Sequence, residues 1–224
     1  MAIGWYDTEE PMKTISLGHH NQDEAAAIAV DFLLGGGVVV LPTDTAYALA
    51  ADATSDAAVK AVQKLKGRES TNPFSVVVGS REQAEAIAQF STEAAKLWTA
   101  FMPGPLTLVL PIAQAAGLAE GVMASAAGSQ TVGLRHPEYS FDTLVAERLE
   151  RPFTATSANR GGNPPAYDVG EFLDSLPDEL APHCVIDAGT LEIRPVSTVV
   201  SIVDAVTVLR EGAIPASRIT EILE

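Results

Sequence analysis

The stretch SDAAVKAVQKLKGRESTNPFSVVV (residues 55–78) contains a helix pattern, a stop signal and a strand pattern in one run. Ser55 suits a helix N-cap, and apolar residues recur every three or four positions across 59–65, as on one face of a helix. Gly67 predicts the end of the helix, because glycine readily adopts the left-handed conformation of a C-terminal cap. The following FSVVV is short, apolar and rich in β-branched residues, which predicts a buried strand. A helix that leads directly into a buried strand indicates an α/β protein.

The same alternation continues outward in both directions. Residues 23–37 combine an acidic start, apolar helical spacing and a glycine stop, and VVVLP (38–42) follows as a strand. Ser80 and Gln83 form a capping-box pattern at the start of another helix. Further helices are predicted near 91–101, 140–149, 169–176 and 215–224, and further strands near 106–111, 131–135, 153–157, 184–187, 197–203 and 206–210. Strands and helices do not alternate strictly, so we predict one α/β domain with a twisted mixed sheet flanked by helices.

Composition restricts the class of protein. The chain has 224 residues, of which 47% are hydrophobic, so it can bury a large core and is neither disordered nor fibrous. No apolar run is long enough to cross a bilayer, and the N-terminus lacks the order of a signal peptide. We therefore expect a cytoplasmic protein without a membrane partner. Cys184 lies in an apolar run, which favours a buried, inert thiol.

Charge is unevenly distributed along the chain. The net charge is -15, from 14 Lys and Arg against 29 Asp and Glu, which opposes an extended nucleic-acid surface. Yet Lys64, Lys66 and Arg68 fall within five residues. One interpretation is a solvated helix end, since the helix dipole favours cations there by roughly 0.3–1 kcal/mol. The other is an anion site, because Arg68 lies beyond the helix stop on a loop leading to a strand, where α/β proteins place ligands.

Two further loops are rich in groups that bind phosphate or ribose. PTDTAYAL (42–49) and TATSANRGGNPP (154–165) both continue apolar strands and carry hydroxyl, amide and small residues. The usual phosphate, dinucleotide and nucleophile motifs are absent from the sequence. None of the four histidines has a partner at metal-ligand spacing, so we expect no metal site formed by side chains and no covalent catalysis.

These segments, taken together and in order, resemble the YrdC-like family, the threonylcarbamoyl-AMP synthases. The resemblance rests on residues 41–78, 102–111, 131–137, 154–166, 196–204 and 208–214. It implies a mixed sheet around a basic cleft. The implied organisation is an N-terminal polar segment (1–22), a catalytic domain (23–215) and the end of a C-terminal helix (216–224), as in the short, single-domain form of the family.

The resemblance implies a defined reaction. L-threonine, bicarbonate or CO2, and ATP would give L-threonylcarbamoyladenylate and pyrophosphate, the first step in modifying adenosine 37 of tRNA. A downstream threonylcarbamoyl transferase complex would complete the modification, with Mg²⁺ accompanying ATP and no prosthetic group; weak tRNA binding is allowed. The chemistry brings a carbamate anion to the α-phosphate, so it requires cations and hydrogen-bond donors and no protein nucleophile.

Carried over by position, the resemblance also implies site residues. The catalytic set is Lys66, Arg68, Ser157 and Asn159. The ATP contacts are Arg68, Asn72, Thr131, Ser157 and Arg210. The threonine contacts are Thr45, Arg135, the backbone of Ala155, and Ser197. Arg135 suits the substrate carboxylate because its planar guanidinium can donate two parallel hydrogen bonds. Thr131 and Ser197 could instead be ordinary strand hydroxyls, and Arg135 and Arg210 could form surface ion pairs.

The chain departs from the usual family pattern at four places. Ala48 replaces a glycine, Glu69 replaces a proline, Val77 stands where some members have histidine, and residues 160–162 read Arg-Gly-Gly instead of Leu-Ser-Gly. These changes leave open a noncatalytic RNA- or nucleotide-binding relative of the same fold. Arg135 favours the synthase, because a pure RNA binder needs no amino-acid pocket.

Overall fold

The described part of the chain forms one continuous mixed sheet with helices on both faces. The computed structural model describes residues 11–18, 21–67, 73–114, 116–126, 128–138 and 140–224. Within these residues the strands are β1 (Lys13–Ser16), β2 (Val39–Pro42), β3 (Tyr47–Ala50), β4 (Ser75–Val77), β5 (Leu106–Pro111), β6 (Met123–Ala126), β7 (Ser129–Arg135), β8 (Phe153–Ser157), β9 (Cys184–Asp187), β10 (Thr198–Ile202) and β11 (Val206–Arg210). The helices are α1 (Gln22–Leu34), α2 (Asp56–Lys66), α3 (Arg81–Ile87), α4 (Thr92–Phe101), α5 (Ser140–Leu149), α6 (Val169–Asp174) and α7 (Ala216–Leu223), with a 3-10 turn, η1 (Glu120–Val122).

The strand order is β1-β9-β2-β3-β8-β4-β7-β5-β10-β11, and β6 pairs with β7 alone. Parallel pairs (β1 with β9, β2 with β9, β4 with β7, β5 with β10) are mixed with antiparallel ones such as β2 with β3 and β8 with β4. The predicted mixed sheet is therefore confirmed. β8 occupies the middle of this order, so it joins the two halves of the sheet.

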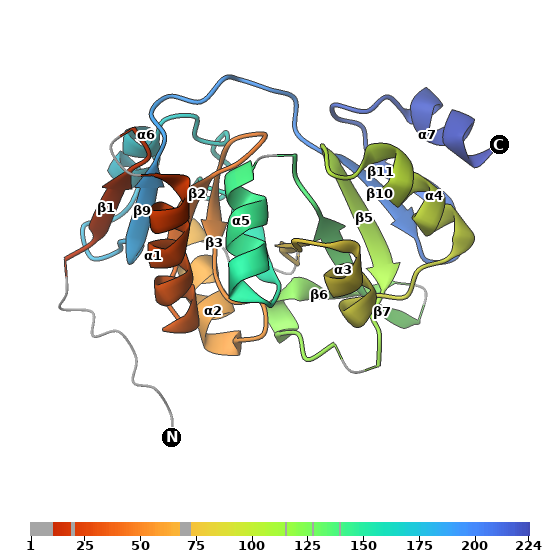
Figure 1. Cartoon of the computed structure of the whole chain (residues 1–224), viewed down its shortest axis with the longest axis horizontal. Helices are drawn as coiled ribbons and strands as arrows, with labels where there is room; N and C mark the ends of the chain where they lie inside the picture. Colours follow the sequence, from red (N-terminus) through yellow and green to blue (C-terminus); the bar gives the residue numbers. More distant parts are fainter. Residues whose placement is uncertain (1–10, 19–20, 68–72, 115, 127, 139) are drawn as a thin grey trace.

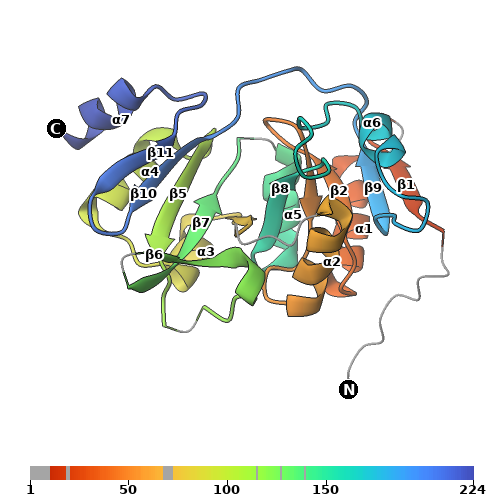
Figure 2. The same cartoon turned by 180° about the vertical axis from the view of Figure 1, so that it is seen from behind.

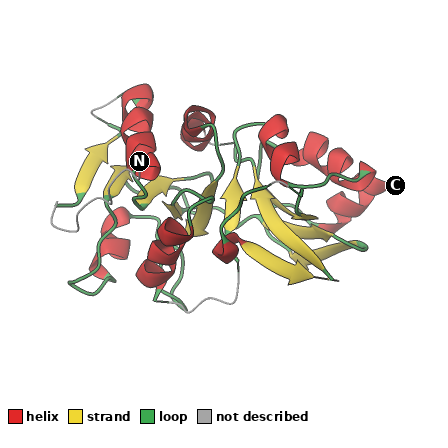
Figure 3. Cartoon of the chain, turned by 90° about the horizontal axis from the view of Figure 1, so that it is seen from below, coloured by secondary structure: helices red, strands yellow, loops and turns green. Residues whose placement is uncertain are grey.

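Different helices cover the two faces of the sheet. α1 and α5 pack against each other in front of the sheet in Figure 1, whereas α2 lies on the opposite face, in front in Figure 2. The view from below shows helices on both sides of the strands (Figure 3). β2 is buried on both faces: Val39 and Leu41 pack with α1 and α5, and Val40 joins the core on the side of α2. A strand buried in this way reads as a continuous apolar run.

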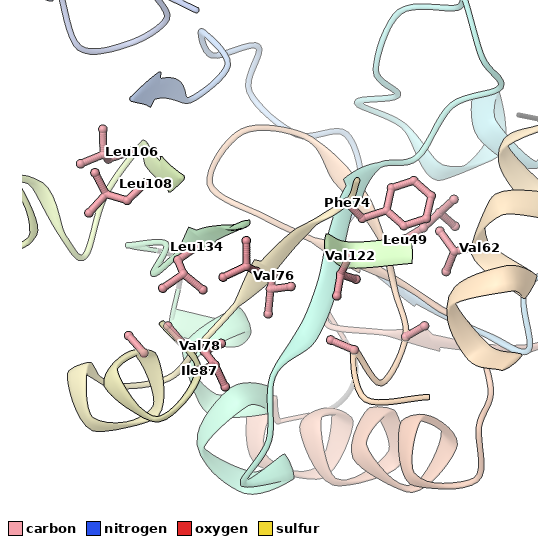
Figure 4. Packing of buried hydrophobic residues seen from close by; sticks show 14 of the residues in the cluster. Leu49, Val62, Phe74, Val76, Val78, Ile87, Leu106, Leu108, Val122 and Leu134 are labelled. Carbon is pink, nitrogen blue, oxygen red and sulfur yellow. The ribbon is translucent and has the colours of Figure 1, made fainter. Parts of the chain in front are cut away.

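The core on the side of α2 extends across the sheet. Leu49 and Phe74 pack near Val62 of α2. Val76 and Leu134 continue this core toward β5 (Figure 4). Among the described residues, no helix is both long enough and apolar enough to cross a membrane.

The helix ends follow the local signals in the sequence. Ser55 caps α2 by accepting a hydrogen bond from the Ala58 amide, and Gly67 ends the helix in the left-handed conformation with φ of 59°. Both predictions are confirmed. Ser80 accepts from the Gln83 amide as predicted, but the Gln83 side chain accepts from the Gly79 amide, so the reciprocal bond of the capping box is displaced by one residue.

Two strands lie where the sequence indicated loops or a polar segment. Tyr47–Ala50, predicted within a loop, forms β3, which pairs with β2 and β8. All four of its residues are buried, so the alternation that marks a half-exposed strand is missing, and alanine is a weak strand former. Lys13–Ser16, within the segment expected to be only polar, forms β1 at the sheet edge, where it pairs in parallel with β9.

Candidate functional site

Loops from both halves of the sheet enclose one cavity of about 360 Å³. Its wall combines the β2–β3 loop, the end of α2, the ends of β7, β8 and β11, and the residues before β10. Eight of the residues expected at the site line it: Thr45, Lys66, Arg135, Ala155, Ser157, Asn159, Ser197 and Arg210. Within the described residues, the lining includes three cationic side chains and no Asp or Glu.

Three predicted residues are not placed in this cavity. Arg68 and Asn72 lie outside the described residues, as does Glu69. Thr131 is buried in β7, its hydroxyl donates to the Ala124 carbonyl of β6 at 3.4 Å, and it does not line the cavity. The structure thus places the Thr131 hydroxyl against β6 and not in the cavity, and its assignment as a nucleotide contact stays a prediction. This position is compatible with the alternative of an ordinary strand hydroxyl.

Lys66 anchors the loop that follows β8, which we call the serine loop (residues 157–163). Its side chain is buried, and its ammonium donates to the Ser157 carbonyl at 2.7 Å and to Asn159 Oδ1 at 2.9 Å. The Ser157 hydroxyl also donates to Asn159 Oδ1. Asn159 Nδ2 in turn donates to the carbonyls of Arg160 and Asn163. Asn159 thus organises the loop, and Lys66 fixes the loop to the end of α2.

The serine loop is joined to α2 a second time. The Gly161 amide donates to the Lys66 carbonyl at 2.8 Å, and Arg160 Nη1 lies 3.4 Å from the Leu65 carbonyl. A cation is favourable there because the last carbonyls of a helix carry partial negative charge. A Cβ atom at Gly67 would lie 2.3 Å from Arg160 Nη2, so a larger residue at this position would displace the Arg160 guanidinium. Arg160, a departure from the usual family pattern, therefore completes the C-terminal end of α2.

Arg135 lies at the end of β7 and forms a buried ion pair, whereas the sequence suggested at most a surface one. Its Nη2 donates to Asp44 Oδ1 at 2.6 Å, and both side chains are 8% exposed. Burial raises the pKa of the nearby Asp142 carboxyl well above its usual value, and the charge of Asp44 raises it further, whereas Arg135 opposes the shift. Burial therefore favours the uncharged acid at Asp142, and Asp44 is the carboxylate on Arg135. Asp44 could have been noticed as the acid of the TDT loop, but Asp142 carries no signal in the sequence.

Arg210, at the end of β11, contacts Ser197, the residue before β10. Arg210 Nη2 donates to the Ser197 carbonyl at 2.9 Å and to its hydroxyl oxygen at 3.1 Å. The Ser197 hydroxyl also lies 2.9 Å from Thr107 Oγ1 of β5. Burial lowers the pKa of Arg210, and the charge of Arg135 adds to this effect. Two guanidinium groups that repel each other across a cavity favour an anion between them.

The β2–β3 loop is organised by Thr43, a second residue that the sequence analysis missed. Its hydroxyl donates to the Ala46 carbonyl at 2.7 Å and accepts from the amides of Thr45 and Ala46. Thr45 consequently lines the cavity in a fixed turn. Ala48, another departure from the family pattern, also lines the cavity, whereas Val77 is buried and does not.

Cys184, in β9, is a further buried group with a shifted pKa. Cys184 is fully buried as predicted, and burial raises the pKa of its thiol to about 11. Within the described residues, no group of three or more His, Cys, Asp or Glu side chains is arranged to hold a metal ion.

Comparisons with known proteins identify relatives across nearly the whole chain. A Sua5/YciO/YrdC family model, described as "Telomere recombination", matches residues 31–212. A threonylcarbamoyl-AMP synthase of Pyrococcus abyssi is 34% identical over 198 residues, covering 88% of this chain and 56% of that protein. A putative threonylcarbamoyl-AMP synthase of Mycobacterium tuberculosis is 38% identical over 200 residues, covering 87% of each chain. The chain thus spans just over half of the Pyrococcus relative and most of the mycobacterial one.

Solved structures agree with these matches. The structure of P. abyssi Sua5 complexed with L-threonine has a TM-score of 0.82 and 30% identity, covering 96% of this chain and 61% of that one. Escherichia coli YciO, at 22% identity, has a TM-score of 0.77 over 92% of this chain and 97% of that one, which shows the shared fold. On the extent of the family match and the 38% identity to the mycobacterial relative, the chain belongs to the Sua5/YciO/YrdC family.

Proposed function

We propose that this protein is an L-threonylcarbamoyladenylate synthase, a nucleotidyltransferase that converts L-threonine, bicarbonate or CO2, and ATP to L-threonylcarbamoyl-AMP and pyrophosphate. The observation that carries the proposal is the single cavity in which Arg135, Arg210 and the serine loop converge. The names of the relatives, threonylcarbamoyl-AMP synthases from an archaeon and from a mouse, support it.

The charges around the cavity suit the proposed reaction. A carbamate must approach the α-phosphate of ATP while negative charge grows on the leaving pyrophosphate. At an effective dielectric constant near 20, two opposite unit charges about 4 Å apart attract each other by roughly 4 kcal/mol. Two or three cations in the cavity can therefore offset much of the repulsion between the carbamate and the phosphates. Donors fixed before the substrates arrive stabilise the transition state without reorganisation, and the hydrogen bonds of the serine loop supply such rigidity.

We propose a division of roles among the residues that line the cavity. We assign ATP to Ser157 and Arg210, together with Arg68 and Asn72 from the sequence. We assign L-threonine to Thr45, Arg135, Ala155 and Ser197. The contact between Arg210 and Ser197 makes these two subsites adjacent, as the transfer of a carbamate to a phosphate requires.

The remaining parts of the proposal follow from the reaction. Mg²⁺ would enter with ATP, since the leaving pyrophosphate needs a cation. The product would pass to a threonylcarbamoyl transferase complex that acts on adenosine 37 of tRNA. We place both steps in the cytoplasm and expect at most weak tRNA binding by this chain, because its net charge is -15.

One assay tests the proposal. The protein is incubated with Mg²⁺, ATP, bicarbonate and each amino acid in turn, and both pyrophosphate and the carbamoyl-adenylate are measured. We expect both products with L-threonine, and none when bicarbonate is removed. ATP binding without pyrophosphate release for any amino acid would favour the noncatalytic nucleotide-binding alternative.

A further inference from the structure

Arg135 already holds a carboxylate before any ligand binds. The proposed function assigns this guanidinium to the carboxylate of the amino acid, yet its Nη2 lies 2.6 Å from Asp44 Oδ1. Both side chains are 8% exposed, so solvent screens the pair weakly. A ligand carboxylate must therefore share Arg135 with Asp44 or take its place.

The ion pair is incompletely satisfied. Arg135 Nε and Asp44 Oδ2 are buried and, within the described residues, neither has a hydrogen-bond partner. Buried polar atoms normally find partners, and each one left alone costs free energy. Asp142 does not supply the missing charge, because its burial favours the neutral acid. The arrangement thus leaves one donor on Arg135 and one acceptor on Asp44 unused.

The pair lies in the wall between two cavities. Arg135 lines the cavity of the candidate site, and Asp44 lines a neighbouring cavity of about 420 Å³. Thr45 lines both, so they meet at the β2–β3 loop. A small ligand that separates Arg135 from Asp44 would contact both side chains at once.

We propose that Asp44 is a specificity-determining residue that selects an amino-acid zwitterion by exchange of ion-pair partners. The ligand carboxylate replaces Asp44 on Arg135, and the ligand ammonium moves to the released Asp44 carboxylate. Every charge keeps an opposite partner, so the exchange avoids the penalty for a buried, unpaired ion. A ligand that lacks either group leaves Asp44 or Arg135 unpaired. This inference rests on the proposed function, because it assumes that an amino acid binds at Arg135.

Calorimetric titration of the full chain with three ligands tests the exchange. L-threonine carries both charges, 3-hydroxybutyrate lacks the ammonium group, and threoninol lacks the carboxylate. For the wild-type protein we expect threonine to bind at least about tenfold more tightly than either analogue, since one charged hydrogen bond accounts for that difference. Equal affinity for threonine and 3-hydroxybutyrate would overturn the proposal without use of any variant.

The variant Asp44→Asn separates exchange from simple orientation of Arg135. We expect threonine binding to weaken while 3-hydroxybutyrate binding holds or strengthens. The ratio of the two affinities should therefore fall about tenfold, toward unity. Asp204→Asn, an exposed change in the β10–β11 turn, is the matched control and should keep the wild-type preference. A parallel loss of affinity for both ligands would show that Asp44 only orients Arg135, and would overturn the exchange.

The outcomes distinguish this inference from the proposed function. If the wild-type protein binds amino acids and the variant keeps the full preference for threonine, the exchange fails while the synthase proposal stands. If the wild-type protein binds ATP but no amino acid from a complete panel, the proposed function fails and the exchange falls with it.

Discussion

The ammonium group of Lys66 points into the fold, where it holds the serine loop through the Ser157 carbonyl and Asn159. Lys64, two residues earlier on the same helix, is exposed. We predict that Lys66→Met lowers the free energy of unfolding by about 1–3 kcal/mol, because it removes both hydrogen bonds of the Lys66 ammonium, which hold the serine loop. Lys64→Met should change it by less than about 0.5 kcal/mol. Urea titrations of both variants measure the difference, and equal stabilities would contradict the anchoring role.

Asp142 gives the stability of the protein a dependence on pH. Its pKa in the folded state is raised well above the usual value of an aspartate, mainly by burial. The native state therefore keeps a proton that the unfolded state releases, so the contribution of Asp142 is fully present below about pH 4 and is lost as pH rises through the raised pKa. We predict that wild-type protein loses stability relative to Asp142→Asn as pH rises from about 4 through the raised pKa.

Urea unfolding at several pH values measures this effect. Because the two proteins share all other titrating groups, the difference between their curves isolates Asp142. The free energy of unfolding changes by about 1.4 kcal/mol for each unit by which the pKa of Asp142 differs between the folded and unfolded states. Parallel curves would mean that Asp142 is ionised in the folded protein, and that a second buried charge faces Asp44 and Arg135.

At the scale of elements, the C-terminal end of α2 depends on the contact between Gly67 and the serine loop. Gly67 has φ of 59°, and an added Cβ would lie 2.3 Å from Arg160 Nη2. Gly117 has the same φ with no atom within 4 Å of an added Cβ. Both substitutions by alanine meet the left-handed backbone penalty of roughly 1–2 kcal/mol, but only the first also displaces Arg160. We therefore predict that Gly67→Ala lowers stability more than Gly117→Ala.

A double-mutant cycle attributes the excess to Arg160. In an Arg160→Ala background, Gly67→Ala should cost about as much as Gly117→Ala, because the displaced guanidinium is gone. Denaturant midpoints of the four proteins give the coupling energy. An unchanged excess in that background would place the strain in the backbone of α2 and not in its contact with the serine loop.

At the scale of the whole molecule, the sheet brings scarce cations to one place. The chain has 29 acidic and 14 basic residues, yet the described lining of the cavity contains Lys66, Arg135 and Arg210 and no acid. Arg135 comes from β7, and Arg210 from the end of β11. The central strand β8 joins the halves of the sheet that carry these residues. Cationic side chains at the cavity wall favour small anions, whereas the acidic balance of the whole chain disfavours long polyanions.

The sequence by itself determined the features whose causes are local. Ser55 and Gly67 specify the two ends of α2, because a cap depends on residues within one turn of the helix. The buried strands were visible as apolar runs, and the order of the family segments indicated the residues that now line one cavity. The position of Cys184 in an apolar run likewise indicated its burial.

The tertiary structure alone decided the features whose causes are distant along the chain. β3 is a strand because β2 and β8 pair with both of its edges, although its alanines favour no strand locally. Lys66 turns inward because Ser157, 91 positions away, presents a carbonyl to it, and Arg135 meets Asp44 across the same separation. Hydrogen bonds and ion pairs depend on the distance between two groups in space. The sequence therefore shows which charged and polar groups are present, whereas only the tertiary structure shows which of them are close enough to interact.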